Sequence, residues 1–124
     1  MSGNEYLIDT NIVLYLMKGD KTLAEILHHQ KIYLSFISEL ELLGYRNLSE
    51  KDLMHIENFI SDCVVIDINQ EIKRITIDLR RKSHLKLPDC IIAATSIYLN
   101  VPFLTADADF KSVDDLLLIL YELT

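Results

Sequence analysis

Residues 5–19 read EYLIDTNIVLYLMKG, and this stretch decides the fold. It opens with a short apolar run over 5–8 that predicts a buried strand and ends at Asp9. Apolar residues then recur with helical spacing over 11–18, up to Gly19, which is a suitable helix stop. The stretch therefore predicts a strand that leads almost directly into a helix, with a carboxylate at the junction.

The same alternation continues along the rest of the chain. Short apolar or β-branched runs predict further strands, and segments with helical periodicity lie between them. Ser49, followed three residues later by Asp52, resembles a capping box, and Pro88 suits the first position of a helix. The predicted strands are 5–8, 32–35, 63–66, 102–104 and 117–120, and the predicted helices are 11–18, 21–29, 36–45, the segment after Ser49, 70–84 and 88–100.

Strands without polar alternation, separated by helices, indicate a parallel sheet that is covered on both faces. The sequence therefore predicts an α/β protein with a three-layer α/β/α sandwich around a central parallel sheet. Its 124 residues have room for a single domain, 1–124, and half of them are apolar, which is enough to fill one core. In such sheets ligands bind beyond the carboxyl ends of the strands, where Asp9 and the loop 105–109 are expected.

The formal net charge of −7 argues against a protein that binds nucleic acid through a broad basic surface. This objection weakens if four of the acidic residues converge, because two divalent cations would cancel such a cluster. The chain has no apolar run near the roughly 20 residues that span a bilayer, and its start does not resemble a secretory signal. We therefore expect a cytoplasmic protein without a membrane partner.

Three of the candidate acids have ordinary structural explanations when each is taken alone. Asp9 and Asp89 each stand where a helix begins, so either could cap backbone N–H groups or favour the helix dipole. Asp107 and its neighbour Asp109 could be turn residues. These explanations leave the role of each residue open.

Glu41 is harder to explain structurally. On a helical wheel it lies beside Ile37 and Gly44 and roughly opposite Glu39, which we expect to face solvent. A carboxylate near an apolar face is costly unless it is paired or bound to a metal, and no Lys or Arg lies one turn away. The alternative is that Glu41 reaches water past Gly44.

Four carboxylates that meet in space would repel one another, so a fold gathers them mainly to bind hard cations. Oxygen ligands without His or Cys favour Mg²⁺ or Mn²⁺ over zinc. The four histidines are scattered along the chain, which indicates surface residues rather than ligands. The acidic set predicts a site for Mg²⁺ or Mn²⁺.

Four segments, in this order, resemble the motifs of the PIN-domain family and in particular its small VapC-type toxin ribonucleases. They are DTN at 9–11, SFISELELLG at 35–44, LPDCIIAA at 87–94 and TADADF at 105–110. The resemblance spans almost the whole chain. It implies a divalent-metal-dependent endoribonuclease that cleaves RNA phosphodiester bonds, with one or two cations.

The resemblance also implies roles for individual residues and partners. It makes the four acids Asp9, Glu41, Asp89 and Asp107 both the catalytic residues and the metal ligands, and it makes Thr10, Asn11, Thr105 and Asp109 supporting residues. Members of this class are the toxins of type II toxin-antitoxin pairs, so a cognate antitoxin is the expected protein partner. Many form homodimers.

One dense basic stretch, over 79–86, leads directly into Asp89 and could follow an RNA backbone. The alternative is that its positive charges complement the negative end of a helix. The candidate RNA-binding residues are Arg80, Arg81, Lys82 and Lys86.

Two other functions fit parts of the pattern. A receiver domain of two-component signalling has a similar length, strand–helix alternation and a Mg²⁺-binding acidic cluster, but it needs paired acids after the first strand and a Lys after the fifth, which this chain lacks. A catalytically silent PIN module that serves only to bind a partner is the other alternative.

Overall fold

The structure, a computed structural model, describes residues 4–123. Within them the strands are β1 (Glu5–Ile8), β2 (Lys31–Ser35), β3 (Val64–Ile66), β4 (Phe103–Thr105) and β5 (Leu118–Leu120). They form one sheet in the order β3-β2-β1-β4-β5, and every neighbouring pair is parallel. The predicted parallel sheet is confirmed. The order differs from the 2-1-3-4-5 order of receiver domains, so the receiver alternative is wrong.

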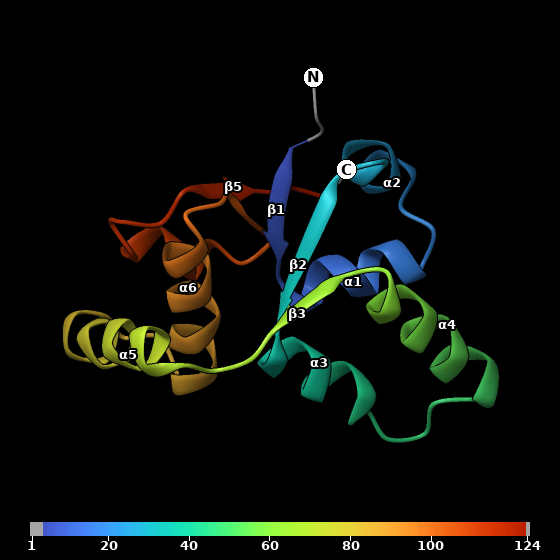
Figure 1. The fold of residues 1–124 in the computed structure, drawn as a ribbon. Helices are drawn as coiled ribbons and strands as arrows, with labels where there is room; N and C mark the ends of the chain where they lie inside the picture. Colours follow the sequence, from blue (N-terminus) through green and yellow to red (C-terminus); the bar gives the residue numbers. More distant parts are fainter. Residues whose placement is uncertain (1–3, 124) are drawn as a thin grey trace.

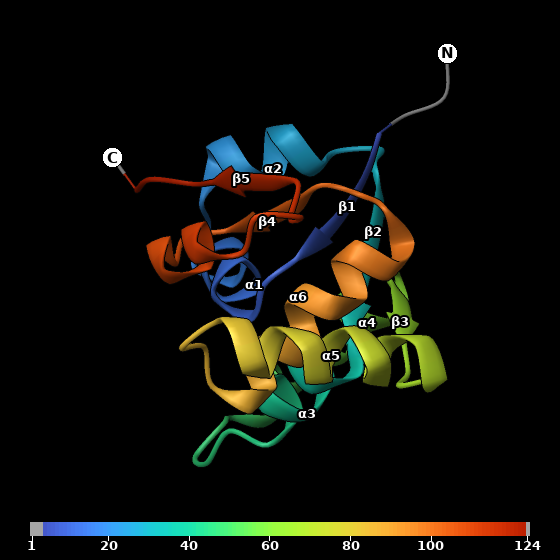
Figure 2. The same cartoon turned by 90° about the vertical axis from the view of Figure 1, so that its left-hand side faces the viewer.

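Helices cover both faces of the sheet, as expected for a three-layer sandwich. They are α1 (Thr10–Met17), α2 (Lys21–Leu27), α3 (Phe36–Leu43), α4 (Glu50–Ser61), α5 (Gln70–Lys82), α6 (Leu87–Leu99) and the 3-10 helix η1 (Ala108–Ser112). Figures 1 and 2 show α5 and α6 on one side of the sheet and α1, α2 and α4 on the other. Helix α3 directly follows β2, at the carboxyl end of that strand (Figure 1).

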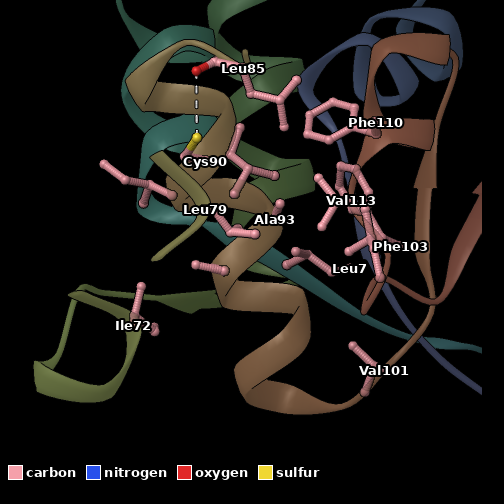
Figure 3. Close-up of a cluster of buried hydrophobic side chains, with 14 residues drawn as sticks. Leu7, Ile72, Leu79, Leu85, Cys90, Ala93, Val101, Phe103, Phe110 and Val113 are labelled. Carbon is pink, nitrogen blue, oxygen red and sulfur yellow. Dashed lines mark hydrogen bonds between the residues drawn. The ribbon is translucent and has the colours of Figure 1, made fainter. Parts of the chain in front are cut away.

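Each face of the sheet has its own apolar core, because successive residues of a strand point to opposite faces. In β1, Leu7 belongs to the core under α5 and α6, and its neighbour Ile8 belongs to the core under α1, α2 and α4. Figure 3 shows the first of these cores around α6. Ala93 and Ala94, on the face of α6 that packs into this core, are fully buried.

The predicted boundaries differ from the observed ones by at most two residues, and the first strand matches at both ends. The helix predicted over 70–84 ends at Lys82, because Ser83 is extended and both its backbone N–H and its hydroxyl donate to the Leu79 carbonyl. The strand predicted over 102–104 is shifted by one residue and ends at Thr105. This shift matters for the site, because Thr105 becomes the last residue of β4.

The predicted cap of α4 is confirmed, because Ser49 accepts a hydrogen bond from the backbone N–H of Asp52. Pro88 lies in the first turn of α6 but is its second residue, one position later than predicted. In the part of the chain that the structure covers, no helix combines the length and the apolar character needed to cross a bilayer.

Candidate active site

The site is organised around the junction of β1 and α1. Asp9 is the N-cap of α1 and is only 6% exposed. Its Oδ1 accepts a hydrogen bond from the backbone N–H of Thr10 (2.8 Å), and its Oδ2 accepts one from the Thr105 hydroxyl (2.7 Å). Both carboxylate oxygens are therefore held in place, one by its own helix and the other by the end of β4. The capping role of Asp9 is real, and it leaves the functional role open.

Burial dominates the electrostatics of this carboxyl group. It raises the pKa of Asp9 from 3.8 to about 6, although the hydrogen bonds from Thr105 and Thr10 act in the opposite direction. The negative charges of Asp89 and Glu41 raise this pKa further. No ion pair within residues 4–123 involves any of these three acids. The fold thus keeps a buried carboxyl group close to other acids without a cationic side chain to neutralise it.

Glu41 lies on α3, where its side chain contacts Thr10, the first residue of α1. Its Oε1 accepts a hydrogen bond from the Thr10 hydroxyl at 2.7 Å, so Thr10 binds Asp9 through its backbone and Glu41 through its side chain. The expectation that Glu41 lies near an apolar face was wrong, because its side chain is exposed while Glu39 is half-buried. The buried residues of α3 are Ser38 and Leu42, so its inward face is rotated from the one that the helical wheel indicated.

Asp89 lies in the first turn of α6 and is half-buried. Burial raises the pKa of this carboxyl group, and so do the charges of Asp107, Glu41 and Asp109. The ammonium group of Lys86 acts in the opposite direction and lowers it. Asp89 is therefore under the electrostatic influence of three acids that come from two other segments of the chain, α3 and the turn after β4.

Asp107 and Asp109 lie in the turn after β4, in agreement with the expectation that both could be turn residues. Asp107 caps η1, and its Oδ1 accepts a hydrogen bond from the backbone N–H of Asp109 (2.9 Å). The turn is also tied to the site, because the backbone N–H of Asp107 donates to the Thr105 hydroxyl (3.0 Å). Asn11 Oδ1 accepts a bond from the backbone N–H of Ala106 (3.3 Å) and so connects α1 to the same turn.

These contacts bring the four predicted acids to one edge of the sheet, together with the predicted supporting residues. Within residues 4–123, however, no three side chains of His, Cys, Asp or Glu lie close enough together to hold one metal ion. The acids influence one another electrostatically without forming a closed three-ligand cage. Mg²⁺ is compatible with such an arrangement, because it usually retains several waters and is bound through one or two carboxylates.

An open pocket of about 530 Å³ adjoins these acids. Asp89, Asp107, Asp109 and Ser112 line it together with Lys82, the last residue of α5, and the loop 83–86 between α5 and α6. The Leu85 carbonyl fixes this loop, because it accepts hydrogen bonds from Arg80 Nη1 (2.9 Å) and from the thiol of Cys90 (3.6 Å, Figure 3). The pocket therefore has an acidic wall and a wall that carries basic side chains.

The predicted basic stretch does not act as one surface. Lys82 and Lys86 line the pocket, although Lys82 also pairs with Asp78 at 3.0 Å. Arg81 lines a different pocket, which it shares with Arg74, and Arg80 donates to the Leu85 carbonyl in the loop that follows α5. Of the four basic candidates, two therefore lie beside the acids and two do not.

Sequence reasoning missed Ser38. Its side chain is completely buried, and its Oγ lies 2.9 Å from the Thr10 hydroxyl oxygen. The signal was available, because Ser38 precedes Glu41 by three residues and such residues share a helix face. It also missed the pocket-lining residues Ser83, His84, Leu85 and Ser112.

Comparison with solved structures identifies similar chains over nearly the full length. A toxin-antitoxin complex from Klebsiella pneumoniae is 27% identical, with a TM-score of 0.80 over 95% of this chain and 99% of the other. VapBC-1 from nontypeable Haemophilus influenzae is 25% identical, with a TM-score of 0.74 over 94% and 97% of the two chains. VapBC2 from Rickettsia felis, bound to a DNA fragment from its promoter, is 22% identical, with a TM-score of 0.81 over 95% and 99%.

No curated protein sequence matches this chain. The family model of the PIN domain matches residues 6–116, which include all four acids and the supporting residues around them. The chain therefore belongs to the PIN-domain family.

Proposed function

We propose that this protein is a divalent-metal-dependent endoribonuclease and the toxin of a type II toxin-antitoxin pair. Membership of the PIN-domain family, with VapBC proteins among the structural neighbours, supports the coarser role of a toxin nuclease. The observation that carries the finer proposal is the buried, unneutralised Asp9, which is held by Thr10 and Thr105 and is repelled by Asp89 and Glu41.

The donor chemistry of the site fits a hard divalent cation. The proposed ligands are all carboxylates, which favour Mg²⁺ or Mn²⁺, and the acids raise one another's pKa, so a nearby cation would relieve their mutual repulsion. The proposed ligands are Asp9, Glu41, Asp89 and Asp107. When bound, the cation would neutralise charge on a phosphodiester and make a nearby water a better nucleophile.

The remaining side chains have supporting tasks in this proposal. Thr10 and Thr105 orient the carboxylates of Glu41 and Asp9, and Asn11 holds the turn that carries Asp107 and Asp109. Hydrogen bonds from fixed donors keep such ligands in a productive orientation. In this proposal the catalytic groups come from the segments directly after β1 and β4 and from α3 and α6.

The pocket beside the acids is the proposed path for RNA. Its volume of about 530 Å³ lies in the range of small-molecule sites, so it can take part of a nucleotide. Lys86 and Lys82 on one wall are the proposed phosphate contacts, whereas the positions of Arg80 and Arg81 give no support to such a role. This division explains how an acidic protein can hold a polyanion at one place.

The proposed partners follow from the similar structures. The Klebsiella pneumoniae chain belongs to a toxin-antitoxin complex, and the Haemophilus influenzae chain to VapBC-1. We infer a cognate antitoxin for this chain by that likeness, and further a homodimer and a cytoplasmic location.

Cleavage of single-stranded RNA by the purified protein tests the enzymatic proposal. We expect cleavage with Mg²⁺ or Mn²⁺ and none with EDTA. Glu41→Gln should lose nearly all activity, whereas Glu39→Gln, which changes a second glutamate of the same helix outside the site, should retain it. Equal activity of the two variants, or cleavage that survives EDTA, contradicts the proposal.

One observation favours a second candidate. The absence of a closed three-ligand cage within residues 4–123 is what a catalytically silent PIN module would show. Such a module would bind its antitoxin but neither Mn²⁺ nor RNA. Metal binding by the unmodified protein therefore separates the two functions.

A further inference from the structure

Glu41 is a proposed metal ligand whose side chain needs to be held in one orientation. Its side chain is exposed, and an exposed glutamate samples many rotamers, so holding it in one of them costs conformational entropy. A metal ligand has to be held in one orientation before the ion arrives. The one hydrogen bond that the Glu41 side chain makes within residues 4–123 comes from the Thr10 hydroxyl, at 2.7 Å.

Thr10 can hold Glu41 only while its single hydroxyl proton points at the carboxylate. The Thr10 oxygen also lies 2.9 Å from the oxygen of Ser38, so the proton has two possible acceptors. A hydroxyl group supplies one proton and two lone pairs, and an ionised carboxylate can only accept. Two protons are therefore shared among three groups.

Only one arrangement uses both protons. The Ser38 side chain is 0% exposed, and Thr10 is its one hydrogen-bond partner within residues 4–123. If Thr10 donated to Ser38, the Ser38 proton would have no acceptor and Glu41 would lose its donor, and an unsatisfied buried donor destabilises the fold. With Ser38 donating to Thr10, the Thr10 proton is directed to Glu41 and every group is satisfied.

We propose that Ser38 is a positioning residue that acts through Thr10 to hold the Glu41 carboxylate toward Asp9. Ser38 and Glu41 are three residues apart on α3, so both face the first residue of α1. The backbone N–H of Thr10 simultaneously binds Asp9. Through Thr10, the buried hydroxyl group of Ser38 is thus linked to the carboxylates of Glu41 and Asp9. This inference rests on the proposed function.

Ser38→Ala tests this role because it removes the hydroxyl group and leaves the helix intact. We expect the affinity for Mn²⁺, measured by calorimetry, to fall about 10-fold, which is at the lower end for loss of a residue that orients a ligand. The kcat/KM for RNA at subsaturating Mn²⁺ should fall by a similar factor and recover at saturating Mn²⁺. Ser38→Thr, which keeps the hydroxyl group, should recover much of the affinity if it folds.

Ser96→Ala is the matched control. Ser96 is also a buried helical serine, 1% exposed, but its hydroxyl donates to the Val101 carbonyl at the other end of α6. This variant should lose stability without any change in Mn²⁺ affinity. Urea unfolding of both variants shows whether a loss of affinity merely follows a loss of stability.

A double-mutant cycle with Glu41→Gln gives the decisive result. If Ser38 acts through Glu41, Ser38→Ala should have little further effect on Mn²⁺ affinity once Glu41 is Gln. Equal affinities of Ser38→Ala and the unmodified protein, or additive effects in the double variant, overturn the positioning role while leaving the nuclease proposal intact. An unmodified protein that neither binds Mn²⁺ nor cleaves RNA overturns both.

Discussion

Replacing Asp9 with Asn should make the metal-free protein more stable. Asp9 is nearly buried, and its pKa rises from 3.8 to about 6 in the folded state. An acid whose folded pKa lies above its unfolded pKa opposes folding when it is ionised, because the folded state binds more protons. A shift of about 2 pKa units, at 1.36 kcal/mol per unit, corresponds to about 3 kcal/mol at neutral pH.

Because the folded-state pKa of Asp9 is raised, the stability of the protein depends on pH in a definite direction. The contribution of Asp9 to the free energy of unfolding falls as the pH rises from 3.8 through about 6, and the penalty is complete near neutral pH. The amide of Asn resembles the protonated carboxyl group and does not titrate. The free energy of unfolding of Asp9→Asn should therefore exceed that of the unmodified protein by about 1 kcal/mol near pH 4.5 and by about 3 kcal/mol near pH 7.

Urea unfolding in EDTA across this pH range measures the difference directly. Asp115→Asn, at an exposed aspartate, is the control and should stay within about 0.5 kcal/mol of the unmodified protein throughout. A difference between Asp9→Asn and the unmodified protein that does not change with pH, or an Asn variant that is less stable at neutral pH, refutes the reasoning. Stability gained at the cost of activity is the expected behaviour of a functional carboxylate.

Three further predictions concern the cation, Thr105 and RNA. Mg²⁺ should raise the urea midpoint at about pH 7.5 and have much less effect near pH 5, where a proton competes for Asp9; equal effects at the two pH values would contradict binding at this carboxylate. Thr105→Val removes the hydrogen bond that lowers the pKa of Asp9, so the acidic limb of the profile of kcat/KM against pH should move to higher pH. An acidic limb at the same pH in this variant would show that Thr105 does not influence catalysis through Asp9. Lys86→Gln should reduce the salt dependence of RNA binding by about one unit of slope, whereas Arg81→Gln should leave it unchanged; identical slopes for both variants would exclude the pocket as the RNA path.

The sequence was sufficient to predict the sheet and the acidic edge. Asp9 and Thr105 follow or end apolar runs, and the carboxyl ends of parallel strands meet at one edge, so these residues had to come together. Asp89 could be placed because Pro88 marks the start of its helix. These predictions depend on local signals whose spatial consequence is set by topology alone.

What the sequence could not predict depends on the rotation of helices and on where they end. Glu41 was expected near an apolar face, but α3 turns Ser38 and Leu42 inward and leaves Glu41 exposed. Arg81 and Lys86 belong to one basic stretch of the sequence, yet Lys86 lines the pocket beside the acids and Arg81, on α5, lines a different one. Helix packing decides both outcomes, and a single sequence contains no direct signal for it.

The central claim is that carboxylates from distant parts of the chain jointly bind a divalent cation. Anomalous diffraction from crystals grown with Mn²⁺ tests it most directly. We predict an anomalous peak between Asp9 and at least one of Glu41, Asp89 and Asp107, and no peak in crystals of Asp9→Asn. A peak that persists in Asp9→Asn, or Mn²⁺ bound only elsewhere on the unmodified protein, would contradict the claim.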